Sequence, residues 1–470
     1  MILASALLSL AAPARAEEAP VGGRVSLDAA LSRALSRYRS LEAKRYEVDA
    51  AEARATGARD AYLPDVTAAA QQSFGTVNGA FGPQTPIGVQ GISSAGPVAP
   101  EQSYNAAFGA NYLLAFNWEL FSFGRVDSRI DLADASVRRA KADLEQERFA
   151  LKVRVAGVYL DLLVAQQLTR VAGANLERAA SVESAVEARS RTGLVPEVDR
   201  ETASAEVSRA RLAVVDARDR EQRLSTQLAI YLDVVPGRDQ RSALFDLDES
   251  YLSRSPSRFA TAASLEDNPQ LQYQSSRVDE AEALAKATSR SIRPSLNLGA
   301  AYHLRASGFG FDYAPTNGRY TTSYVDGVWP NRSNFIVGIT LSWNLMSPLK
   351  NRGANASSEA TAAAARSDHD LLESQLRNQA SLADVRITNM LEFVREVPRQ
   401  LSAAEAAYTQ KKALYDNGLS TLVEIQQALY TLNRAEADRS VAYAGLWQAL
   451  LQKAAAAGDF DLFYSQARLP

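Results

Sequence analysis

The chain has 470 residues, two His and no Cys. The lack of Cys excludes a disulfide scaffold, a thiolate metal site and lipid attachment through an N-terminal Cys. Its 51 Lys and Arg nearly balance its 54 Asp and Glu, which argues against nucleic acid as a partner. The sequence has no run of eighteen apolar residues beyond its start, so no transmembrane helix is expected.

The first sixteen residues have the features of an export signal. They read MILASALLSLAAPARA and end in an A-x-A pattern, which predicts a signal peptide over 1–16. A buried N-terminal helix is the alternative. The segment lacks the usual basic start, which leaves the position of the start codon open. An exported chain without a membrane helix is periplasmic, secreted or an outer-membrane β-barrel.

No motif in the chain indicates chemistry. The sequence contains no H-E-x-x-H, G-x-S-x-G or P-loop spacing. His303 and His369 stand far apart, and neither has a His, Cys or carboxylate at ligand spacing, so both are interpreted as ordinary surface residues. We therefore expect no enzyme activity, no cofactor and no metal site.

The first half of the mature chain begins with a helix and a strand. Residues 27–62 are rich in Ala, Leu, Glu and Arg without Pro, which predicts a long helix. Pro64 ends it, and a strand is expected over 64–74. The segment 75–103 is rich in Gly and Pro and reads as a loop.

A second strand, over 105–121, has the clearest pattern in the chain. Over 106–120 its even positions are apolar or aromatic, and its odd positions, apart from Leu113, are small or polar, including Asn111 and Asn117. This period of two over more residues than the roughly 9–11 that cross a membrane predicts a membrane strand. Trp118 and Phe121 suit an aromatic girdle at the membrane interface. A solvated strand of a soluble sandwich would alternate in the same way.

Two helices complete the first half. A heptad-like apolar stripe predicts a helical run over 124–192, and a second helix is expected over 197–233. Between them, Gly193 and Leu194 precede Pro196, a pattern typical of a helix C-cap followed by a new helix start.

The second half repeats this order. Trp343 follows Trp118 by 225 residues, and Gly418-Leu419 follows Gly193-Leu194 by the same spacing. The sequence thus predicts a tandem duplication, with one repeat over 17–235, a polar connector over 236–263 and a second repeat over 264–457. The second repeat is expected to contain a helix at 265–292, strands at 295–305 and 334–346, a helical run at 350–417 kinked at Pro398, and a helix at 420–457, before a tail at 458–470.

Four strands per chain cannot close a membrane barrel, which needs eight or more. The chain is therefore expected to oligomerise. Three copies would give twelve strands around a lumen lined by Asn111, Asn117, Asn297 and similar residues. The predicted fold is mixed α and β: four membrane strands contribute to a trimeric twelve-stranded β-barrel, which a long antiparallel α-helical periplasmic barrel continues.

The order of elements, the duplication, the two Gly-Leu turns and the strand phrases FNWELFS and LSWNLMS resemble the TolC-type outer-membrane efflux proteins. The resemblance covers about 26–458. It implies a homotrimer in the outer-membrane lipid with a periplasmic extension. It also implies an exit duct for an efflux pump or a type I secretion system, with a periplasmic adaptor and an inner-membrane transporter as partners.

The resemblance also implies roles for residues at the helix turns. Gly193, Leu194, Gly418 and Leu419 would form the tip that docks the adaptor. Asp199, Tyr415 and Glu424 match residues that close the family's aperture; alternatively, Tyr415 and Glu424 are ordinary helix-surface positions. Ser420 and Gln427 stand where the family often has Arg and an acid, so the closing network is only partly present.

Two other protein classes fit less of the sequence. A periplasmic coiled-coil adaptor would share the helices but has no need for four long strands. A stand-alone porin would have many strands and few helices. The sequence does not name the cargo, which could be a drug, a metal or a polypeptide.

Overall fold

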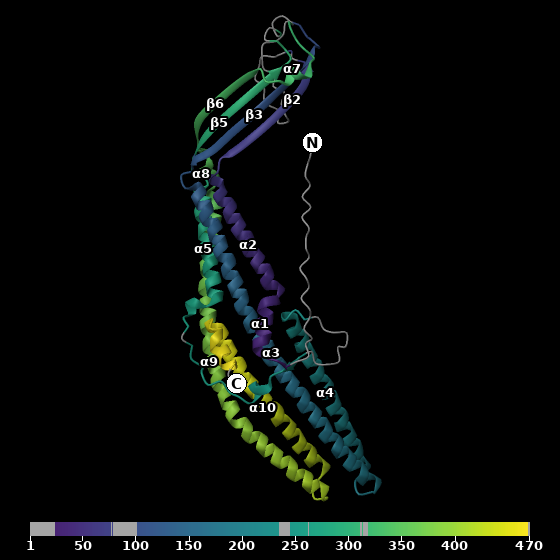
Figure 1. The fold of residues 1–470 in the computed structure, drawn as a ribbon. Helices are drawn as coiled ribbons and strands as arrows, with labels where there is room; N and C mark the ends of the chain where they lie inside the picture. Colours follow the sequence, from purple (N-terminus) through teal and green to yellow (C-terminus); the bar gives the residue numbers. More distant parts are fainter. Residues whose placement is uncertain are drawn as a thin grey trace. The chain divides into compact units, whose positions relative to one another are not determined.

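The computed structural model describes residues 24–76, 78, 101–234, 245–261, 263–310, 313 and 318–468 (Figure 1). The expected signal peptide and most of the loop at 75–103 lie outside these residues. The chain forms two compact units. One combines Met1–Glu47, Lys141–Ser275 and Asp368–Pro470, and the other combines Val48–Ala140 and Ser276–Ser367. Each unit therefore draws on both halves of the sequence.

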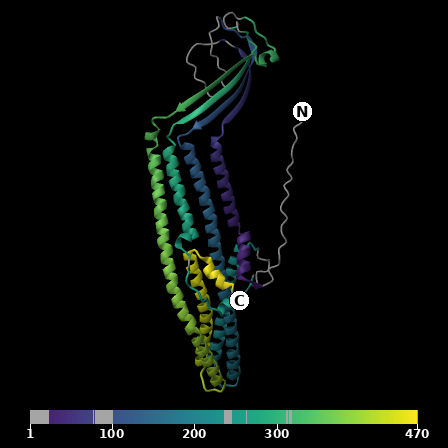
Figure 2. The ribbon, with the colours of Figure 1, turned by 60° about the vertical axis from the view of Figure 1, so that its left-hand side comes forward.

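The second unit contains a four-stranded antiparallel sheet. Its order is β2-β3-β5-β6, with β2 at Asp65–Thr76, β3 at Ala106–Phe121, β5 at Ser295–Ser307 and β6 at Arg332–Ser342. Figures 1 and 2 show these strands side by side. Strand β6 ends four residues earlier than expected, before Trp343. The outer edges of β2 and β6 have no strand partner among the described residues.

The two faces of this sheet differ in polarity, as the alternation predicted. On one face Leu298 of β5 pairs with Ile339 of β6, and Tyr302 pairs with Phe335. The neighbouring positions, such as Asn297 opposite Thr340, are on the other face. A β-bulge in β3 lies between Glu119 and Phe121. It brings Phe121 opposite Leu296, and thus onto the same face as Trp118, which pairs with Leu298.

Helices complete the second unit. Three whole short elements belong to it: the 3-10 turn η1 (Asp60–Tyr62), α7 (Tyr324–Val328) and α8 (Ser347–Lys350). It also includes parts of four longer helices: α2 (Arg39–Arg59), α3 (Arg125–Arg191), α5 (Pro269–Arg290) and the start of α9 (Arg352–Asp416). Ion pairs join them, among them Arg59 with Asp134 at 2.6 Å and Lys286 with Asp131 at 2.7 Å. Both pairs are largely exposed, so each contributes little to stability.

The first unit is built from long helices. It contains α1 (Leu27–Arg37), most of α3 and α9, α4 (Glu197–Tyr231), α10 (Leu422–Ala457) and α11 (Phe460–Ala467). In Figures 1 and 2, α3 runs beside α4 and α9 beside α10. Small and branched residues form the contacts, as where Ala404 of α9 packs with Leu432 and Ala435 of α10. Helix α9 continues through Pro398 without ending.

The single helix expected over 27–62 is divided at Tyr38. This residue has an extended backbone, with φ −65° and ψ 118°. No Pro or Gly causes the break. The Tyr38 ring instead packs edge-on against Tyr231 at 5.7 Å, and Arg33 Nε donates to the Leu232 carbonyl at 3.1 Å. These contacts with α4 outweigh local helix propensity.

The helix expected over 265–292 also starts differently. A 3-10 turn, η3 (Leu265–Asp267), precedes α5, and Asn268 lies between them. The Asn268 side chain is fully buried; it accepts from the Gln270 amide at 2.9 Å and donates to the Ala456 carbonyl at 3.0 Å. It therefore caps the start of α5 and the end of α10 together. The following residues, expected as a tail, form α11.

The polar connector contains β4 (Asp246–Leu247), which pairs in parallel with β1 (Arg24–Val25) near the start of the described chain, and the 3-10 turn η2 (Glu249–Leu252). Trp447 of α10 fixes η2. Its ring is 1% exposed, and its Nε1 donates to the carbonyls of Tyr251 at 3.1 Å and Arg254 at 3.0 Å. Tyr251 Oη in turn donates to the Ala467 carbonyl at 3.0 Å, and burial raises the pKa of Tyr251 to about 12.

Over the described residues, no helix combines the length and the apolar character that a membrane span requires.

Candidate functional site at the helix tips

Both Gly-Leu turns adopt the same backbone conformation. Gly193 has φ +75° and Gly418 has φ +77°. In the first turn, the Gly193 amide donates to the Ser190 carbonyl at 3.0 Å and the Leu194 amide donates to the Arg189 carbonyl at 2.9 Å. In the second turn, the amides of Gly418 and Leu419 likewise donate to the carbonyls three and five residues earlier, at 3.0 and 2.8 Å. This pair of bonds is the Schellman motif, and the positive φ explains why Gly stands at each turn.

The turns present apolar side chains to solvent. Leu194 is 75% exposed and Leu419 is 74% exposed. One helical turn further on, Val198 and Val423 are also exposed, at 65% and 71%. The sequence analysis did not single out these valines, although they too are 225 residues apart. Each tip therefore carries a Leu and a Val in the same relation, and we call these four residues the tip patch.

A cavity of about 580 Å³ lies between the two turns. Arg189 and Asp199 line it, together with Tyr415 and Ser420. The Arg189 guanidinium donates to the carbonyls of Tyr415 at 2.8 Å and Asp416 at 2.6 Å. These carbonyls belong to the last turn of α9, where a cation is favourable. Arg189 of α3 thus joins the first tip to the second.

Tyr415 is buried, with 3% of its surface exposed, and is therefore not an ordinary helix-surface residue. It packs in a cluster with Val186, Leu422 and Ile425, while the Arg189 guanidinium lies 4.7 Å from its ring centroid. Its hydroxyl has no hydrogen-bond partner. Burial raises the pKa of Tyr415; the Asp199 charge adds to this rise, and Arg189 opposes it. Tyr415, Asp199 and Arg189 therefore influence one another electrostatically.

Glu424 forms part of a helix cap. Thr421 is the N-cap of α10: its side chain accepts from the Glu424 amide at 3.4 Å, and the Glu424 carboxylate accepts from the Thr421 amide at 3.2 Å. This is a capping box. The carboxylate also accepts from the Ser420 hydroxyl and lies 3.5 Å from Lys411 Nζ. The Ser420 hydroxyl, followed by the Thr421 amide and Lys411, lowers the pKa of Glu424.

We expect Thr421→Ala to weaken the start of α10 by about 1 kcal/mol, because it removes one half of the box. Hydrogen–deuterium exchange of this turn should rise about five-fold, as follows from that energy. Thr409→Ala, at an exposed Thr that bonds the Glu405 carbonyl inside α9, is the control. Equal exchange in wild type and Thr421→Ala would contradict the cap.

The cap should also depend on pH. Because the pKa of Glu424 is lower in the folded protein than its ordinary 4.5, its stabilisation is present above that value. It is lost as the pH falls through the lower, folded pKa. Corrected for intrinsic rates, wild-type exchange at this turn should therefore rise at acid pH, whereas Glu424→Gln, which removes the titrating carboxylate, should respond less.

Trp118 and Trp343, which are predicted to lie at a membrane interface, each donate a hydrogen bond within the sheet unit. Trp118 Nε1 donates to the Tyr62 carbonyl at 2.8 Å, and Trp343 Nε1 donates to the Ile292 carbonyl at 3.1 Å. Each acceptor stands two residues before the Pro that ends a helix. Trp343 is 56% exposed and Trp118 37%, so both indoles remain partly available to a membrane interface. Phe121 is 55% exposed.

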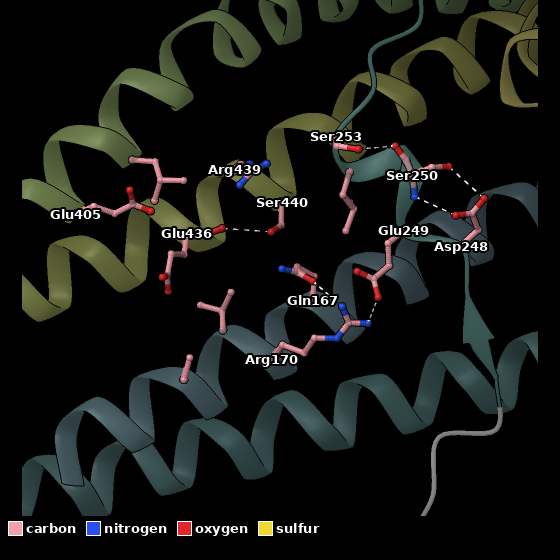
Figure 3. Close-up of a pocket in the computed structure, with 14 residues that line it drawn as sticks. Gln167, Arg170, Asp248, Glu249, Ser250, Ser253, Glu405, Glu436, Arg439 and Ser440 are labelled. Atoms are coloured by element: carbon pink, nitrogen blue, oxygen red, sulfur yellow. Dashed lines mark hydrogen bonds and ion pairs between the residues drawn. The ribbon is translucent and has the colours of Figure 1, made fainter. Parts of the chain in front are cut away.

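A separate pocket of about 600 Å³ lies between α3, η2, α9 and α10 (Figure 3). It contains none of the residues singled out from the sequence. Arg170 and Glu249 pair at 2.5 Å across it, and Glu436 on its wall pairs with Arg178 at 2.6 Å. That pair raises the pKa of Arg178. These pairs join α3 to the connector and to α10.

One sequence interpretation needs correction. His369 does have carboxylates at ligand spacing, because ligand atoms of His369, Asp370 and Glu373 lie within 4.8 Å of one another. The three residues share one turn of α9, and Asp370 is exposed. The Glu373 carboxylate also pairs with Arg377. An exposed group of this kind is common in proteins without a metal, and it supports no metal site here.

Comparisons with known proteins agree with this architecture. Residues 30–232 match the sequence model of the family described as outer membrane efflux protein. No curated protein sequence matches the chain.

The fold is similar to that of solved outer-membrane channels. The VceC protein of Vibrio cholerae has a TM-score of 0.70 at 16% identity, over 92% of this chain and 96% of that one. The CmeC channel of Campylobacter jejuni has a TM-score of 0.72 at 13% identity, over 94% of this chain and 89% of that one. The MtrE channel of Neisseria gonorrhoeae, in its open state, has a TM-score of 0.69 at 17% identity, over 92% of this chain and 88% of that one. At these identities the likeness concerns the fold. Taken with the sequence match over 30–232, it confirms the resemblance to the outer membrane efflux proteins.

Proposed function

We propose that the protein is the exit duct of a tripartite efflux pump or a type I secretion system. It assembles as a homotrimer in the outer membrane and extends into the periplasm. Its cargo is a small molecule or a polypeptide that an inner-membrane transporter delivers through a periplasmic adaptor. The chain itself performs no reaction. The match to the outer membrane efflux protein family supports this proposal.

One observation carries the proposal: the sheet is incomplete in a single chain. The edges of β2 and β6 are unpaired among the described residues. The apolar face of β6 is open, with Phe335 81% and Ile339 66% exposed. Such edges and faces lead to aggregation in water. Pairing with two further copies would satisfy the edges, and lipid would cover the apolar face.

The tip patch is the proposed docking surface. Leu194 and Leu419 lie at the ends of turns whose geometry does not depend on them, because backbone bonds and Gly define both turns. Their exposure is therefore available for a partner. Asp199 and Tyr415, with Arg189 between the two tips, are proposed to hold the helix pairs together at the aperture. Glu424 contributes there through its cap.

We expect chemical crosslinking in native outer membranes to yield a three-chain species as the largest specific product. The reason is that one sheet of four strands cannot close a barrel, and the three copies that the family resemblance implies give twelve strands. A monomer or dimer as the largest species would contradict the proposal. The trimer should resist mild washing, which would release a periplasmic adaptor.

Deletion of the gene tests the duct itself. The deleted strain should accumulate an efflux dye such as ethidium, or retain a polypeptide that the parent secretes, and the intact gene should restore export. Normal dye efflux together with an unchanged secreted protein profile would argue against both forms of the proposal.

A further inference from the structure

A third cavity lies at the end of the sheet where β5 ends and β6 begins. Its volume is about 680 Å³. Three arginines line it: Arg305 at the end of β5, Arg319 in the connecting segment and Arg332 at the start of β6. Asp326 of α7 is the one carboxylate on the described walls. The described walls thus carry three cations and one carboxylate in a chain that is acidic overall.

The three guanidinium groups have no acidic partner among the described residues. None of them forms an ion pair with any residue that the structure describes. Within the described part of the chain, their side chains form one hydrogen bond, from Arg332 Nη1 to the Asn331 carbonyl at 2.9 Å. Arg305 and Arg332 also stand directly opposite each other in the β5–β6 register. Like charges in this position destabilise a strand pair. An anion between them would remove that repulsion.

The cavity walls are fixed by short backbone contacts. Thr321 donates to the Gly308 carbonyl, and Gly310 to the Arg319 carbonyl, each at 2.8 Å. At Gly308 a Cβ would lie 2.7 Å from the Thr321 carbonyl oxygen, so the two segments approach as closely as Gly permits. The rings of Phe309 and Tyr320 stack at 6.3 Å beside these bonds. Arg319 is therefore held near the strand ends before any ligand binds.

We propose that this cavity binds a compact, multiply charged anionic group of the phosphate class. Guanidinium groups match phosphate oxygens in paired hydrogen bonds, and a cleft with one dominant sign of charge concentrates counterions. Aliphatic or aromatic ligands would leave the three cations without partners. The site is independent of the tip patch, and it can be tested in the purified protein whether or not the duct proposal holds.

The register of β5 indicates where the anion comes from. Arg305 lies on the same face as His303 and Asn297, which is the polar face of the sheet. The opposite face carries Tyr302 and Leu304. A soluble anion therefore reaches Arg305 from the polar side, whereas the phosphate of a lipid headgroup would have to pass the edge of the sheet. We assign the site to soluble anions.

The test uses the full-length protein purified in a non-ionic detergent. Binding of inorganic pyrophosphate is measured by isothermal titration calorimetry in low salt. The triple variant R305Q/R319Q/R332Q removes the three cations, and R129Q/R352Q is the control, since Arg129 and Arg352 are exposed and lie outside the cavity. We expect the triple variant to bind at least ten-fold more weakly and the control to bind like wild type.

A second arm distinguishes the sources of the phosphate group. Binding to phosphatidylcholine vesicles with and without lipid A is compared for the same proteins. Pyrophosphate binding that depends on the three arginines supports the soluble-anion site. Loss of a lipid A preference in the triple variant, with no pyrophosphate binding in wild type, would overturn that assignment in favour of a headgroup site. Equal pyrophosphate binding by wild type and the triple variant, or no binding of either probe by wild type, would overturn the proposal altogether.

Discussion

Replacing both Leu194 and Leu419 with Asp is expected to abolish the proposed export while the proposed trimer still assembles in the outer membrane. Both side chains are about three-quarters exposed in the free chain. Burial of a leucine against a partner contributes about 2 kcal/mol. Two leucines per chain would therefore supply a large part of the free energy of docking. A carboxylate in their place adds the cost of removing a charge from water.

Assembly should survive because the backbone alone defines both turns. The glycines, with their positive φ, and the two amide bonds at each turn remain in the variant. Export of dye or polypeptide, and crosslinking to the adaptor, are the measurements. Leu194→Met with Leu419→Met is the matched control, which keeps an apolar side chain of similar volume and should export normally. Normal export by the Asp variant would show that the tips are turns without a docking role.

The largest loss of stability is expected from Trp447→Ala. The indole is 1% exposed, lies edge-on to Tyr251 at 5.4 Å and to Phe463 at 5.9 Å, and has the Arg254 guanidinium 5.7 Å from its ring. Its removal leaves a cavity among these groups and two carbonyls without their donor. Substitutions of this kind cost about 3–5 kcal/mol. We expect a clearly lower melting temperature in detergent and faster proteolysis in the connector.

Trp447→Phe separates packing from hydrogen bonding. It keeps most of the ring but not the Nε1 donor, so it should cost roughly 1–3 kcal/mol, less than the alanine variant. Tyr251→Phe removes the bond from Tyr251 to the Ala467 carbonyl and should give a smaller loss. A melting temperature for Trp447→Ala equal to that of wild type would show that η2 and α11 do not depend on this side chain.

The sequence analysis identified most elements because their patterns were long. The alternation of 105–121 and the apolar stripe of 124–192 predicted β3 and α3 to within a residue or two. Breaks caused by packing could not be found in this way. Tyr38 ends α1 because of a ring on α4, and Asn268 ends η3 because of carbonyls at the end of α10. Both partners are distant in sequence. The break at Tyr38 has no local signal, whereas Asn268 directly precedes Pro269, a pair typical of a new helix start.

The tip residues show the same limit. The spacing of Gly193 and Gly418 predicted two equivalent turns, and the structure gives both the same hydrogen bonds. The burial of Tyr415 was not foreseen, because it depends on residues of α3 and α10. The capping box, in contrast, could have been read from the sequence: Thr421 and Glu424 have the spacing of the S/T-x-x-E pattern. Their docking and closing roles remain proposals.

The two tryptophan bonds have a consequence for the order in which the sheet forms. Trp118 and Tyr62 are 56 residues apart, and Trp343 and Ile292 are 51 apart. Each bond closes its own hairpin, β2 with β3 or β5 with β6, at the end next to a helix. Loop-closure entropy changes slowly with length, so the two closures cost nearly the same. Each hairpin can therefore fix the register of its two strands as an independent folding nucleus. The pairing of β3 with β5 can follow as a later step, in which the two formed hairpins dock.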